Sequence, residues 1–138
     1  MSNNAITRNK STAGIRITLR IGATVFGLSA LLLAALPGLF LDLLALDGSS
    51  AALTWAMRMI GVTLVALAGN MWFNSMNPSD VSVRRVAAVM AISAGGLGVT
   101  TVLIPVALSW FTVVYAIVGF AFSAAYIYFL SQFRRGAG

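Results

Sequence analysis

Long apolar runs separated by short polar segments dominate the chain. Four runs are each long enough to cross a bilayer, which takes about 20 residues, and they occupy 18–41, 53–73, 86–106 and 110–130. Because backbone groups in hydrocarbon must find hydrogen-bond partners within the protein, each run is predicted to be a helix. Short connections make consecutive helices antiparallel neighbours. We therefore predict an all-α integral membrane protein, an up-down bundle of four helices.

The polar segments divide the chain further. Residues 1–16 read as a polar, basic N-terminal tail, 17–131 as the four-span transmembrane domain and 132–138 as a short basic C-terminal tail. Pro105 marks an end or a kink of the third span, because proline interrupts the hydrogen bonding of a helix. Asp80, with Ser79 before it, is the candidate N-cap of the third helix.

Charge predicts the orientation of the spans. The formal net charge is +6, and in so apolar a chain it indicates membrane orientation rather than nucleic-acid binding. Eight of the nine basic residues fall on the side that holds both termini: Arg8, Lys10, Arg16, Arg20, Arg84, Arg85, Arg134 and Arg135. The positive-inside rule makes that side cytoplasmic. We expect a multi-pass protein of a bacterial inner (plasma) membrane, with both termini inside and anionic headgroups against the cytoplasmic face.

Composition and aromatic placement agree with a membrane protein. Hydrophobic residues make up 59% of the chain and charged residues 9%, whereas a soluble domain carries roughly a quarter charged residues. Aromatic residues of the kind that anchor helices at membrane interfaces lie near the span ends. Those predicted at the outer boundary are Trp55 and Trp110, and those at the inner boundary are Trp72, Tyr126 and Tyr128.

Arg58 is the one basic residue on the outer side. It lies about five residues into the second span, about 7 Å below the boundary, near the loop that holds Asp42 and Asp47. A structural ion pair with one of these aspartates is the first interpretation. A snorkelling or subunit-interface arginine and an anion- or lipid-binding charge are the alternatives. Asn70, about 18 Å further along the helix, is a separate feature for which we expect a helix–helix hydrogen bond.

Small residues recur at helical spacing in the last two spans. Such stripes allow two helix backbones to approach closely. The residues predicted to serve helix packing are Ala87, Ala91, Gly95, Gly98, Gly119 and Ser123. The alternative is a broken helix at "GGLG" (95–98) that lines a substrate path.

The residue inventory leaves little for chemistry. The chain has no cysteine and no histidine, and its three acidic residues are all aspartates. No nucleophile, base and orienting group can be assembled from it, so we predict no catalytic residue, no metal site and no enzyme. A lipid or a quinone could lie against the aromatic fourth span, but nothing in the sequence demands a cofactor.

The stretch "RMIGVTLVALAG" (58–69), an Arg-x-x-Gly near the start of the second span with a later glycine, resembles the DoxX-like four-helix membrane proteins. Members with assigned roles are accessory subunits of membrane redox enzymes or partners of other membrane proteins. The resemblance implies that Arg58, Gly61 and Gly69 are structural positions.

Two functions follow as hypotheses. The first is a non-catalytic accessory or structural subunit of a larger membrane complex, with other integral membrane subunits and lipids as partners. The alternative is a small homo-oligomeric transporter or channel for a small solute, in which Arg58, Asn70 and the "GGLG" region line the path.

Overall fold

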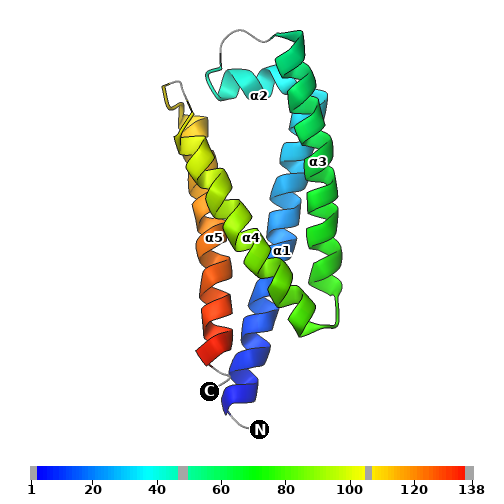
Figure 1. Ribbon diagram of the computed structural model, residues 1–138, viewed down its shortest axis with the longest axis vertical. Helices are drawn as coiled ribbons and strands as arrows, with labels where there is room; N and C mark the ends of the chain where they lie inside the picture. Colours follow the sequence, from blue (N-terminus) through cyan, green and yellow to red (C-terminus); the bar gives the residue numbers. More distant parts are fainter. Residues whose placement is uncertain (1–2, 47–49, 105–106, 136–138) are drawn as a thin grey trace.

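Helices account for nearly all of the described structure. A computed structural model of the protein describes residues 3–46, 50–104 and 107–135. Within these ranges there is no strand, and the helices, shown in Figure 1, are α1 (Asn3–Ala35), α2 (Pro37–Leu43), α3 (Ala51–Met76), α4 (Asp80–Val102) and α5 (Trp110–Arg135). All except α2 are long and apolar enough to cross a membrane. The predicted all-α class and the four apolar span-length helices are confirmed.

The sequence predicts one continuous first span that ends at residue 41, but in the structure this span is interrupted at Leu36. Leu36 leaves helical geometry, with φ −129° and ψ 56°. The cause is Pro37, because proline disfavours the helical conformation of the residue before it and lacks a backbone N–H. Pro37 instead occupies the first turn of α2, where that N–H is not needed. The short helix α2 then runs across the upper end of the bundle in Figure 1.

The other helix ends also differ from the prediction. α1 begins at Asn3, so the described part of the predicted N-terminal tail forms its first turns rather than a separate segment. The turns that hold Ser11 and Ile15 are packed against the rest of the bundle, since both side chains are buried. α4 runs from Asp80 to Val102 rather than over 86–106, and the predicted boundary at Pro105 lies outside the described residues. α5 extends to Arg135, into the predicted C-terminal tail.

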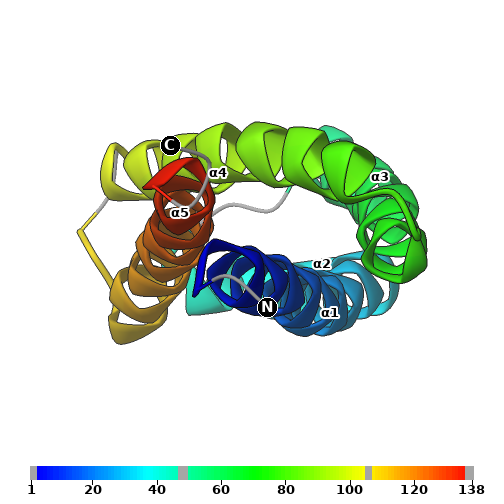
Figure 2. The same cartoon turned by 90° about the horizontal axis from the view of Figure 1, so that it is seen from below.

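The bundle consists of two close-packed helix pairs. α1 packs mainly against α3, and α4 packs mainly against α5, while α1 also contacts α5 and α4. Figure 2 shows the arrangement from the end that holds both termini, with α4 arching from beside α3 towards α5. Contacts between α3 and α4 are few. The two pairs are therefore joined chiefly through α1.

A cluster of buried apolar side chains holds the two pairs together. Its fully buried members come from four helices: Ile15, Leu19, Met71, Val83, Ala87 and Tyr126. Burial and close dispersion contacts stabilise this region, although in a membrane the gain comes mainly from packing. α3 is the least enclosed of the four long helices, because only 6% of its most apolar stretch is buried inside the protein.

Candidate functional site

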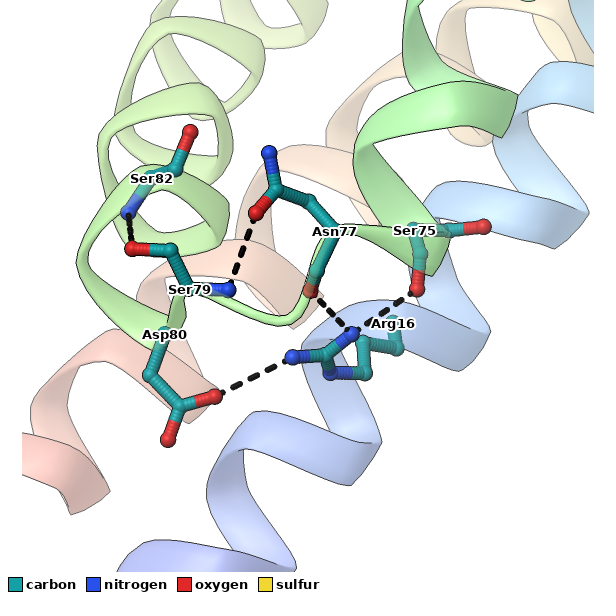
Figure 3. A network of polar contacts seen from close by, with 6 residues as sticks. All are labelled: Arg16, Ser75, Asn77, Ser79, Asp80 and Ser82. Carbon is teal, nitrogen blue, oxygen red and sulfur yellow. Dashed lines mark hydrogen bonds and ion pairs between the residues drawn. The ribbon is translucent and has the colours of Figure 1, made fainter.

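A polar network ties the middle of the chain to the first helix, and Figure 3 shows it in close-up. The Arg16 guanidinium, on α1, donates to the backbone carbonyls of Ser75 at 3.2 Å and of Asn77 at 2.6 Å. Its other terminal nitrogen lies 3.1 Å from a carboxylate oxygen of Asp80, the first residue of α4. One side chain thus contacts the end of α3, the connection and the start of α4.

The local sequence explains why an arginine is held at this place. The last carbonyls of a helix have no partners within it and carry its negative partial charge, so a cation is favoured there. Asn77 accepts a hydrogen bond from the Ser79 backbone N–H at 2.9 Å, which shapes the turn around Pro78. Ser79 then caps α4 by accepting from the Ser82 backbone N–H at 3.4 Å. The predicted capping role of Asp80 thus falls to Ser79.

Arg20, one turn further along α1, adds a second link. Its Nε donates to the Ser75 hydroxyl at 3.3 Å, and that hydroxyl donates to the Trp72 carbonyl at 2.6 Å. Ser75 is only 1% exposed, so its hydroxyl needs these partners. The network therefore links α1 to the end of α3, and each of these donors is held on a fixed acceptor.

The ion pair predicted for Arg58 is absent between the residues that the structure describes. Arg58 is exposed on α3, Asp42 is exposed on α2, and no ion pair joins them. The predicted second partner, Asp47, lies outside the described residues, so that pairing stays a prediction. An arginine does link segments that are far apart in the sequence, but this residue is Arg16, at the opposite end of the bundle.

Asn70 makes its hydrogen bond within a helix rather than between helices. Its side-chain oxygen accepts from the Asn74 side-chain amide at 2.9 Å, and both residues belong to α3. Asn70 itself is exposed. For the described residues, the prediction that Asn70 forms a helix–helix hydrogen bond is therefore wrong. A partner four residues away in the same helix takes this role instead.

Most of the small residues predicted to serve packing lie where α4 meets α5. A Cβ added at Gly119 would lie 3.1 Å from the Ala94 carbonyl oxygen and from the Gly98 backbone nitrogen. Gly95 faces Ser123, and Ala87 and Ala91 are buried in α4. The helix is continuous through "GGLG", so the described residues contain no break at this point.

Ser123 adds a polar link to the same crossing, and we expect its loss to be measurable. Its hydroxyl donates to the Ala91 carbonyl of α4 at 2.8 Å. Ser123→Ala should lower the free energy of unfolding by about 1 kcal/mol, the typical net value of such a bond. Titrating the purified protein from mild detergent into SDS, with helicity followed by circular dichroism, would measure the change.

Ser131→Ala is the matched control for that substitution. The Ser131 hydroxyl also donates to a carbonyl, that of Tyr128 at 2.7 Å, but within α5 itself. Its removal should change stability by no more than about 0.5 kcal/mol. Equal losses of unfolding free energy in the two variants would show that the hydrogen bond between α4 and α5 stabilises the protein no more than one within α5 does.

Four of the five predicted interfacial aromatics present their rings to the surroundings. Trp55, Trp72, Trp110 and Tyr128 are exposed to between 46% and 71%. Tyr126 differs, because it is fully buried and stacks against Phe122 at 6.5 Å between ring centroids. The prediction of Tyr126 as a membrane-interface anchor is wrong, since its ring fills the core between the two helix pairs.

An apolar cavity of about 230 Å³ lies at the α2 end of the bundle, between the helix pairs. Its wall includes Leu33, Phe40, Met57, Leu97 and Tyr115. Two threonines also line it, but each hydroxyl donates to a carbonyl of its own helix, Thr100 to Gly96 and Thr101 to Leu97. Among the described residues, the lining of this cavity is mainly apolar and contains no charged side chain.

Among the described residues, no three His, Cys, Asp or Glu side chains gather as metal ligands would. The chain matches no protein-family model, no curated protein and no solved structure. The resemblance of 58–69 to the DoxX-like proteins therefore stays a prediction. The four long apolar helices indicate a small multi-pass membrane protein.

Proposed function

We propose that the protein is a four-span protein of a bacterial inner membrane that acts as a non-catalytic accessory subunit of a larger membrane complex. Both termini face the cytoplasm in this proposal, because eight of the nine basic residues fall on their side of the sequence layout. The four apolar helices support the membrane location. The role as a subunit depends on what surrounds α3.

The observation that carries the proposal is the exposed Arg58. It lies about 10 Å along α3 from Ala51, in the first third of a helix of spanning length. A charged side chain facing hydrocarbon is costly, by about 3 kcal/mol at the bilayer centre and by less towards the boundary, where Arg58 lies. Arg58 has no ion pair with any residue that the structure describes. A neighbouring membrane chain packed on α3 would supply the acceptors that Arg58 needs.

The rest of α3 supports a partner on the same helix. α3 packs mainly on α1 and leaves most of its circumference uncovered. The polar residues Thr63 and Asn70 are exposed on it together with several large apolar side chains: Trp55, Met59, Val62, Val65 and Phe73. Large aromatic residues and arginine are the types enriched in protein interfaces.

Isolation of the native assembly tests the proposal. After extraction in mild detergent, native mass spectrometry should detect this chain together with larger membrane chains in fixed stoichiometry. Arg58→Leu, which keeps the span apolar, should reduce the co-isolated fraction at least about tenfold, as expected for loss of one buried charge contact. Arg85→Leu, which removes an exposed charge from α4, is the control and should leave the assembly intact.

Two results would contradict this function. A stable homo-oligomer without other chains would favour the transporter or channel. If Arg58→Leu co-isolates the larger partners as well as the unaltered protein does, Arg58 does not contact a partner chain and the proposal loses its main support.

A further inference from the structure

A second cavity, of about 350 Å³, lies between α4 and α5 near the end that holds the termini. It is lined by Arg84, Ala88, Ile127, Leu130, Ser131 and Phe133. Ala88 lies one helical turn deeper along α4 than Arg84, and Ile127 lies deeper along α5 than Ser131. The cavity therefore has a charged group near the helix ends and an apolar floor towards the middle of the bundle.

The Arg84 guanidinium is positioned by an aromatic ring rather than by hydrogen bonds to the described residues. Its guanidinium lies 4.0 Å from the centroid of the Phe133 ring, a cation–π contact that fixes its orientation. Its Nε is buried and has no hydrogen-bond partner among the described residues. Asp80 is the one described acid at this end of the bundle, and it pairs with Arg16. A planar guanidinium with unmatched donors is suited to a bidentate phosphate or carboxylate ligand.

We propose that this cavity binds one anionic phospholipid, with its phosphate on Arg84 and the start of an acyl chain along Ala88 and Ile127. The apolar floor gives a soluble anion nothing to contact, whereas a lipid matches both halves of the cavity. Ile127 is 56% exposed, so the floor opens towards the surrounding hydrocarbon. Basic pockets between membrane helices on the cytoplasmic side are the type of site that takes acidic headgroups.

Recognition in this site depends on Arg84 rather than on its neighbours. The Ser131 hydroxyl proton is committed to the Tyr128 carbonyl at 2.7 Å, so Ser131 cannot also donate to phosphate. Arg85 is the next residue along α4, but it is exposed and does not line the cavity. The two adjacent arginines therefore form a matched pair for experiment, since each substitution removes one charge.

Lipid binding to the purified full-length chain tests the inference. Native mass spectrometry would follow titration with phosphatidylglycerol or phosphatidylcholine at about physiological ionic strength, where exposed charges are screened over about 8 Å. We expect phosphatidylglycerol to bind preferentially. Arg84→Gln should weaken that binding about tenfold or more, as expected for loss of charge-assisted hydrogen bonds to phosphate. Arg85→Gln should weaken it by less than about threefold.

Ala88→Phe is a second variant, which keeps the Arg84 charge and places a large side chain in the apolar floor of the cavity. Ala88→Phe should also weaken phosphatidylglycerol binding, while helicity and the SDS unfolding midpoint show whether each variant is folded. Equal weakening by Arg84→Gln and Arg85→Gln would overturn the proposal in favour of diffuse attraction. Unchanged binding by Ala88→Phe, or displacement of the lipid by inorganic phosphate, would overturn it in favour of a soluble anion. Equal binding of the two lipids would also overturn it.

Discussion

Gly61→Leu is expected to separate α1 from α3 and to produce the largest loss of stability of any single change discussed for this protein. A Cβ at position 61 would lie 2.9 Å from the Ala34 backbone nitrogen and 3.0 Å from the Ala30 carbonyl oxygen. Backbone atoms of a packed helix cannot move aside as the end of a side chain can. We expect a loss of about 3 kcal/mol or more, as for severe overpacking. Titration into SDS, followed by circular dichroism, would measure it.

Gly69 supplies the matched control, because it is in the same helix and a Cβ there meets nothing within 4 Å. Gly69→Leu should change the unfolding free energy by no more than about 1 kcal/mol, and the higher helix propensity of leucine favours a gain. Gly61→Ala should fall between the two leucine variants. If Gly61→Leu and Gly69→Leu unfold at the same SDS fraction, close contact of α1 and α3 at Gly61 does not stabilise the protein.

Arg16→Gln is expected to have the second largest effect. The substitution removes hydrogen bonds to two backbone carbonyls and the ion pair with Asp80. Hydrogen bonds that involve a charged group contribute about 1.5 to 3 kcal/mol each, but Arg16 is only partly buried, with 25% of its side chain exposed. We therefore expect a total loss of about 2 to 3 kcal/mol. The same SDS titration, together with protease cleavage within 77–79, would measure the loss and locate the opening.

Two further substitutions separate the contributions to that loss. Asp80 is 54% exposed, so Asp80→Asn should cost no more than about 1 kcal/mol, and less at high salt. Arg16→Lys should retain only part of the stability. The lysine ammonium lacks the planar guanidinium geometry with which Arg16 reaches three acceptors. If Asp80→Asn costs as much as Arg16→Gln, the ion pair and not the capping of α3 is the main interaction.

The spans could be predicted from the sequence because they depend on local composition. Apolar runs of spanning length have few alternatives to helices, and four such helices are present. The break at Pro37 also had a local signal in the proline itself. Hydropathy alone does not reveal the break, because the residues on both sides of Pro37 are apolar although the helical hydrogen bonding is interrupted there.

The polar network could not be predicted in the same way. Arg16 and its acceptors are 59 to 64 positions apart, and nothing local distinguishes Arg16 from the other basic residues near the N-terminus. The burial of Tyr126 is equally hard to predict, since a tyrosine near a helix end can lie either at the membrane interface or in the packed core. Its ring is buried because α1, of the first helix pair, packs against α5, of the second, and that contact joins elements far apart in the sequence.

The division into two helix pairs has a consequence for biosynthesis. α1 and α3 precede α4 and α5, so the first pair can pack in the membrane while the second is still being synthesised. Ile15 and Leu19 gain their contacts with the second pair only afterwards, as does Arg16 with Asp80. A chain arrested before α4 would thus hold a formed α1–α3 pair whose core face is still uncovered.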